Sequence, residues 1–177
     1  MKKLIAVICA VAMMLAMAIP AMANPSIVEV TATGEGQTED GVSIIVAPVE
    51  VDAYANDTVK DVVTKVNGTE VVLTPAEIAE ALGAENAPAD IADYHQVSTF
   101  MDIVATDGSE INGAVTLQVK FDALVGAEDL ENYLIQVIDP TTGEIYYITL
   151  DPEQFDAETG TITVTFPVAG PFSLIQK

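Results

Sequence analysis

The stretch Gly113-Ala114-Val115-Thr116-Leu117-Gln118-Val119-Lys120-Phe121-Asp122 decides the class of fold, because its apolar and polar residues alternate without a break. The odd-numbered residues from Val115 to Phe121 are apolar, and the even-numbered residues between them are polar. Successive side chains of a β-strand point to opposite faces, so this alternation predicts a strand with one face on a core and the other in water. Residues 161–166 alternate threonine with apolar residues in the same way and predict a second such strand.

Four more strands are expected on either side of these two, at residues 97–104, 132–139, 144–150 and 172–175. Pro140-Thr141-Thr142-Gly143 separates two of them and is typical of a short hairpin loop. Six short strands with turn residues between them predict an antiparallel, Ig-like β-sandwich over residues 90–177.

The first half of the chain mixes two kinds of pattern. Residues 27–33 and 42–51 are rich in β-branched residues and predict strands, with a polar loop over residues 34–41 between them. Valines then recur at Val59, Val62, Val63 and Val66, the spacing of one helix face.

Two short helices are expected in this half. Asn56 or Asp57 is placed to cap the valine helix, and Gly68 to end it. After a short apolar run over residues 71–73, Thr74-Pro75-Ala76-Glu77 is a capping box with proline at the first helical position, and this helix should run to Leu82 with Ile78, Ala81 and Leu82 inward.

The expected organisation follows from these elements. Residues 24–89 should form a small α+β region with two short helices, and residues 90–177 the sandwich domain, with the boundary near Ala89. The predicted fold class is therefore mainly β, or α+β overall.

The strands from residue 97 onward also resemble a known module. The succession of Gly113-Ala114-Val115-Thr116-Leu117-Gln118-Val119, the hairpin of residues 133–150, Thr161–Phe166 and the terminal Gly170-Pro171-Phe172-Ser173-Leu174-Ile175 is similar to an Ig-like β-sandwich module of Gram-positive secreted and cell-surface proteins. The resemblance covers about residues 97–177 and implies a structural or adhesive unit outside the cell, with no catalytic residue to carry over.

Residues 1–23 have the layout of a secretory signal peptide. Lys2 and Lys3 precede an apolar run from Leu4 to Ile19, and Ala21-Met22-Ala23 supplies a cleavage site after Ala23. An uncleaved anchor is the alternative, since residues 4–23 are long enough to span a bilayer. Cleavage would leave a chain with no membrane insertion, located outside the cell or in the cell envelope.

Composition excludes several classes of protein. The chain has 27 acidic and 6 basic residues, and its single cysteine, Cys9, lies in the signal-like segment. Nucleic-acid binding needs a basic surface, so nucleic acid is not an expected partner. A disulfide scaffold, a thiol enzyme and a cysteine-ligated metal site are excluded as well.

The residues available for catalysis are few. His95 is the one histidine, so any serine or threonine nucleophile would have to recruit it as its base. A small secreted hydrolase that uses two carboxylates is the alternative reading, because glycoside hydrolysis needs only such a pair. No spacing in the sequence singles out an acid and a base, and we expect no catalytic site and no bound cofactor other than a possible Ca²⁺.

Calcium is the ligand that the acidic loops would suit, because it takes six to eight oxygen ligands. Three loops could supply carboxylates, although none matches the spacing of an EF-hand loop; their candidate ligands are Asp107, Glu110, Glu128, Asp129, Asp151, Glu153, Asp156 and Glu158. A calcium-stabilised adhesion module is therefore a further alternative. The main expectation is a secreted or envelope-associated interaction or scaffolding protein whose partner is an unidentified protein or envelope polymer.

Overall fold

The computed structural model describes residues 32–38, 40–68 and 73–177. In these residues one antiparallel sheet has the strand order β7-β6-β10-β4-β2-β1-β5-β9-β8, and β3 also pairs with β10. The strands are β1 (Ala32–Gln37), β2 (Ser43–Pro48), β3 (His95–Gln96), β4 (Met101–Ala105), β5 (Val115–Phe121), β6 (Tyr133–Ile138), β7 (Ile145–Thr149), β8 (Phe155–Asp156), β9 (Thr161–Phe166) and β10 (Phe172–Gln176). The protein is therefore mainly β, as the sequence predicts.

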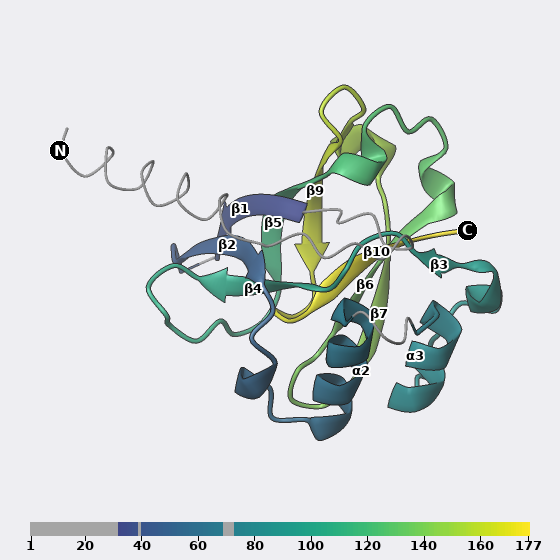
Figure 1. Ribbon diagram of the computed structural model, residues 1–177. Coiled ribbons are helices and arrows are strands. Elements are labelled where there is room, and N and C mark those ends of the chain that lie inside the picture. Colours follow the sequence, from purple (N-terminus) through teal and green to yellow (C-terminus); the bar gives the residue numbers. More distant parts are fainter. Residues whose placement is uncertain (1–31, 39, 69–72) are drawn as a thin grey trace, which may run out of the picture.

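The sheet curls into a half-barrel (Figure 1), and the β-sandwich expected over residues 90–177 is not confirmed. Strands β1 and β2 come from the first half of the chain, yet they lie between β4 and β5 in the sheet. Alternation in a sequence shows that one side of a strand is buried but not which strand lies beside it. One curled sheet and two facing sheets therefore produce the same pattern.

The larger core fills the inside of the curl. The four odd-numbered side chains of β5 are at most 2% exposed, and the inward residues of β6, β9 and β10 pack against them. Phe172 lies at the centre, with its ring 6.2 Å from that of Phe121 and 5.0 Å from that of Phe166. The predicted strand 115–121 is confirmed together with the face that it buries.

Strand β1 corrects the sequence analysis, which expected a loop from residue 34. Gly34 and Gly36 are strand residues on the inside of the curl, paired with Val119 and Leu117 of β5. A Cβ atom on Gly36 would lie 2.5 Å from the carbonyl oxygen of Thr116, so the strands approach too closely there for any side chain. Residues 27–31 of the predicted first strand lie outside the described residues.

The chain just before β4 also differs from the prediction, which placed one strand over residues 97–104. The N–H groups of Val97 and Ser98 both donate to the carbonyl oxygen of Leu174, at 2.9 and 3.2 Å, so the pairing is interrupted after β3. Phe100 then leaves the ladder, and its N–H and C=O are both bonded by the amide side chain of Asn67. Because Asn67 is the last residue of the helix Asp57–Asn67, these two hydrogen bonds connect the interrupted strand to that helix.

Two helices cover one part of the outer surface of the sheet. Helix α2 (Asp57–Asn67) begins at Asn56, whose side chain accepts from the N–H groups of Thr58 and Val59, and it ends at Gly68. Its four valines are buried in one core cluster with Ile138 of β6 and Ile145 of β7. The helix lies beside these two strands in Figure 1. The predicted valine helix is confirmed.

Helix α3 (Pro75–Leu82) has the predicted capping box between Thr74 and Glu77. Its inward face differs from the prediction in one position: Ala81 is exposed, and Ala79, which lies about 200° around the helix from it, is buried instead. Residues 71 and 72 of the short run before it lie outside the described residues. In the ranges that the structure describes, five 3₁₀ turns connect the elements, at Val51–Ala53, Ile91–Asp93, Asp122–Leu124, Leu130–Asn132 and Pro152–Gln154.

Candidate functional site

The outer face of the sheet is divided into a covered and an open part. Helices α2 and α3 pack on the outer face of β6 and β7, whereas the outer face of β1, β5 and β9 is open to solvent. Nine outward side chains make up this open part, which we call the polar grid: Thr33, Glu35 and Gln37 on β1, Thr116, Gln118 and Lys120 on β5, and Thr161, Thr163 and Thr165 on β9. Seven of the nine are exposed, and Thr161 and Thr163 are half-buried.

Strand pairing arranges the polar grid in three straight rows. Each residue of β5 lies opposite one residue of β1 and one of β9, which gives the rows Thr33–Lys120–Thr161, Glu35–Gln118–Thr163 and Gln37–Thr116–Thr165. Neighbouring strands lie about 4.8 Å apart and alternate residues of a strand about 6.8 Å apart, so the grid measures roughly 10 Å by 14 Å between its outer Cα atoms. The hydroxyls of Thr116 and Thr165 are hydrogen-bonded at 2.9 Å.

The polar grid is uncharged overall, although the chain has a net charge of −21. It contains one acid, Glu35, and one base, Lys120, whose Nζ also lies 3.4 Å from Asp122 at its rim. The other seven side chains carry hydroxyl or amide groups, which both donate and accept hydrogen bonds. The core side chains on the inner face of the same strands hold this surface in place.

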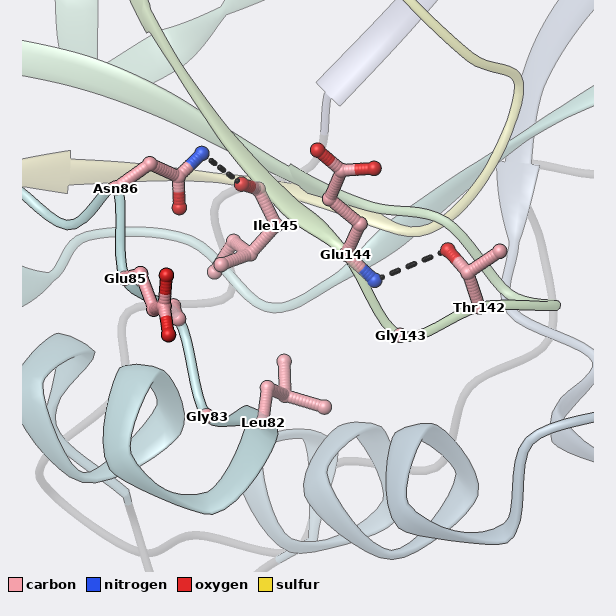
Figure 2. Close-up of a pocket in the computed structure, with 9 residues that line it drawn as sticks. Leu82, Gly83, Glu85, Asn86, Thr142, Gly143, Glu144 and Ile145 are labelled. Atoms are coloured by element: carbon pink, nitrogen blue, oxygen red, sulfur yellow. Dashed lines mark hydrogen bonds between the residues drawn. The ribbon is translucent and has the colours of Figure 1, made fainter.

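A small pocket of about 340 Å³ lies elsewhere, between the end of α3 and the β6–β7 hairpin. Its walls are Leu82, Gly83, Ala84, Glu85, Asn86, Thr142, Gly143, Glu144 and Ile145. The Asn86 amide donates to the carbonyl oxygen of Ile145 at 2.8 Å, and the N–H of Glu144 donates to the Thr142 hydroxyl at 3.2 Å (Figure 2).

The pocket offers two carboxylates, on Glu85 and Glu144. In Figure 2 they lie on either side of Ile145 and do not point toward one another. Paired carboxylates act together in glycoside hydrolysis only when both face the scissile bond. The geometry of this pocket therefore carries no argument for the hydrolase alternative.

The eight predicted calcium ligands are all exposed, and the structure brings two of their three loops together. The N–H of Gly126, which precedes Glu128 and Asp129, donates to the carbonyl oxygen of Ala157, in the loop with Asp156 and Glu158. The loop with Asp107 and Glu110 precedes β5 and so lies at the other end of that strand.

The aspartates of these loops accept hydrogen bonds from their own turns. Asp107 accepts from the N–H and hydroxyl of Ser109, and Asp156 accepts from the N–H of Glu158 and the hydroxyl of Thr159. These bonds hold the pKa of each of the two carboxyls below its ordinary value. Within the described ranges no group of three or more histidine, cysteine or acidic residues is placed to hold a metal ion, and calcium binding stays a prediction.

His95 lies exposed in β3, where it pairs with Gln176 of β10. In the described part of the chain, the hydrogen-bonded serine and threonine hydroxyls are bonded to groups other than the His95 imidazole. The described residues therefore place no hydroxyl nucleophile in hydrogen-bond contact with His95.

A buried polar row crosses the outer face of the sheet beneath the helices. The Gln136 amide donates to the Ser173 hydroxyl at 2.8 Å, and this hydroxyl donates to Gln96 Oε1 at 3.1 Å. Tyr147, opposite Gln136 on β7, extends the row. Among the described residues the Tyr147 hydroxyl, Gln136 Oε1 and Gln96 Nε2 have no hydrogen-bond partner.

One buried pair of acidic groups lies further along this face. The Tyr54 hydroxyl donates to Asp102 Oδ2 at 2.9 Å, and the N–H of Ile103 donates to Asp102 Oδ1 at 3.0 Å. Burial raises the pKa of the Asp102 carboxyl, although both hydrogen bonds act in the opposite direction. Burial and the neighbouring Asp102 raise the pKa of Tyr54 well above its ordinary value.

Sequence reasoning missed the polar grid as a surface, since the members of its rows come from strands far apart in the chain. The alternating threonines of residues 161–165 were predicted, but their alignment with β1 also depends on residues 34–37, which were expected to lie in a loop. Comparisons with protein-family models, curated proteins and solved structures find no match. Neither α2 nor α3, nor any other helix in the described ranges, has the length and apolar character needed to cross a membrane.

Proposed function

We propose that the protein is exported and acts in the cell envelope or outside the cell as a non-enzymatic interaction or scaffolding protein, with the polar grid as its binding surface. The observation that carries the proposal is the contrast between an uncharged, open, rigid face and the acidic character of the rest of the chain. The signal-like order of residues 1–23 supports export.

The relation of residues 97–177 to the sandwich modules of Gram-positive surface proteins is part of the same proposal. Its support is the succession of strands and turns in the sequence. In the structure these strands share one curled sheet with β1 and β2, so the proposed likeness is limited to the order of strands and turns along the chain.

Two experiments test the proposal. The full chain, expressed in a Gram-positive host, should appear in the medium or the wall fraction with Asn24 as its first residue, which mass spectrometry of the N-terminal peptide checks. An intact N-terminus in the cytoplasm would contradict export.

The second experiment is co-sedimentation of the protein with isolated Gram-positive cell walls. Thr116→Glu with Thr163→Glu puts two charges into the polar grid and should reduce the bound fraction. Thr64→Glu with Gln154→Glu adds the same charge at exposed positions on α2 and in the turn before β8, and should not. Equal loss in both variants would show that net charge, and not the grid, determines binding.

A further inference from the structure

We infer that the polar grid binds a neutral, hydroxyl-rich polysaccharide, an inference that rests on the proposed function and names its partner. The grid presents five threonine hydroxyls and two glutamine amides in register on three strands. Sugar hydroxyls also donate and accept hydrogen bonds, so each of these side chains can pair with them in either direction.

The charges of the protein argue against a charged polymer as the partner of the grid. A polyanion would be repelled by a chain with 27 acidic residues, and the grid offers one lysine that is already beside Asp122. A polycation would be drawn to the acidic loops, where eight exposed carboxylates lie, and not to a surface with no net charge. A neutral polymer is the partner whose charge matches the grid.

The chemistry of the grid also argues against a protein or a lipid surface. Stable protein interfaces have an apolar or aromatic centre that is fully buried on binding, and membrane surfaces require apolar side chains that enter the lipid. None of the nine grid side chains is aliphatic or aromatic. Their methylene and methyl groups are small and interleaved with polar atoms.

The threonines of the grid are held in place before they meet a partner. Threonine is branched at Cβ and has few rotamers, and the Thr116–Thr165 hydroxyl bond fixes two of the five threonines further. The inward neighbours Ile162, Val164 and Phe166 are at most 5% exposed, so β9 has little freedom to move. The threonines of the grid therefore lose little side-chain entropy on binding.

Hydrogen bonds that replace bonds to water contribute little each, so affinity must come from repetition along a polymer. We therefore expect long chains of a neutral glycan to bind, and the mono- and disaccharides of the same glycan to compete poorly for the grid. Since charge plays no part, binding should be the same at about 50 mM and about 500 mM NaCl.

The test is co-sedimentation of the protein with insoluble cellulose, xylan and mannan, and with polygalacturonate and chitosan gels as charged references. We expect at least one neutral polymer to retain the protein, and Thr163→Val with Thr165→Val to weaken retention by roughly tenfold or more. Valine keeps the shape and the strand preference of threonine, and thermal melts confirm that the variant is folded.

Thr106→Val with Thr149→Val is the matched control, because both threonines are exposed and lie outside the grid. Equal retention of the two double variants, or retention by none of the neutral polymers, would overturn the inference. Cell-wall binding that is lost when wall proteins are stripped with trypsin would also overturn it, yet would leave the proposed interaction function intact. Failure of the proposed function itself would show as no wall binding before any stripping.

Discussion

Tyr54 and Tyr147 both bring a hydroxyl into the interior beneath the helices, but with different partners. The hydroxyl of Tyr54 is bonded to Asp102, and that of Tyr147 has no partner among the described residues. Burial raises the pKa of Tyr147 to about 12, so this hydroxyl stays protonated and is a buried dipole that has lost its bonds to water. Replacing each tyrosine by phenylalanine therefore compares the loss of a hydrogen-bonded buried hydroxyl with the loss of one that has no partner among the described residues.

We predict that Tyr147→Phe raises the free energy of unfolding by about 1 kcal/mol, because it removes an unsatisfied buried hydroxyl. Tyr54→Phe should lower the free energy of unfolding by about 1–3 kcal/mol, because the buried Asp102 carboxyl loses the hydrogen bond that the Tyr54 hydroxyl donates to it. Urea denaturation of both variants measures the two changes. A loss of stability in Tyr147→Phe would contradict the prediction and would place an ordered water on that hydroxyl.

Asp102 gives stability a pH dependence of unusual sign for a carboxyl. The pKa of Asp102 is raised in the folded protein, so folding favours the protonated carboxyl. Protonation of Asp102 therefore adds to the free energy of unfolding fully at pH values below the pKa in the unfolded chain. This contribution is lost as pH rises through the pKa in the folded protein. We predict that Asp102→Asn stabilises the protein at pH 7, by about 1.4 kcal/mol for each unit of the raised pKa, and that its advantage disappears near pH 4.

Melting curves of wild type and Asp102→Asn between pH 4 and pH 8 test this prediction. The exposed aspartates whose pKa is lowered, among them Asp107 and Asp156, destabilise both proteins alike as pH falls, so they cancel in the comparison. Asp129→Asn removes one charge from the exposed surface and serves as the reference. An advantage of Asp102→Asn that is the same at every pH would contradict the raised pKa.

At the scale of elements, β1 depends on having glycine at positions 34 and 36, where the strand faces the inside of the curl. We predict that Gly36→Ala lowers the free energy of unfolding by about 1–3 kcal/mol, because the new Cβ meets the Thr116 carbonyl and pushes β1 away from β5. Gln37→Ala, on the outer face of the same strand, should cost much less. Thermal melts measure both. A Gly36→Ala protein as stable as Gln37→Ala would show that the curl can open without cost.

The same strand shows why part of the fold could not be predicted from the sequence. Strand β5 and the valine helix α2 were predicted correctly, because the buried face of each is visible in the spacing of its own apolar residues. In β1 the glycines that usually mark a turn mark a close approach between strands, and only the neighbour β5 distinguishes the two cases. The polar grid could not be predicted for the same reason, since its three rows require β1 to lie beside β5.

At the scale of the whole molecule, unbalanced charge is the main property. Each of the four lysines in the described part pairs with one aspartate at the surface, so most carboxylates there have no cationic partner. Exposed pairs of this kind contribute little, and repulsion among the remaining acids opposes folding. Stability should therefore respond strongly to salt.

We predict that raising NaCl from about 20 mM to about 500 mM increases Tm by several degrees. Millimolar CaCl₂ should increase it no more than NaCl and MgCl₂ of the same ionic strength, and EDTA should have no effect. Thermal melts of residues 24–177 measure this. A calcium shift well beyond both references would instead identify a specific site, and the adjacent loops of residues 126–131 and 151–158 are the first place to substitute.

The position of β10 has a consequence for how the sheet closes. This strand pairs with β6 on one side and with β3 and β4 on the other, so it lies inside the sheet and not at its edge. Without β10, the β6–β7 hairpin would have no hydrogen-bonded neighbour in the rest of the described sheet. Strands that are far apart in the sequence must therefore meet before the sheet is continuous, and non-local pairing of this kind is slow.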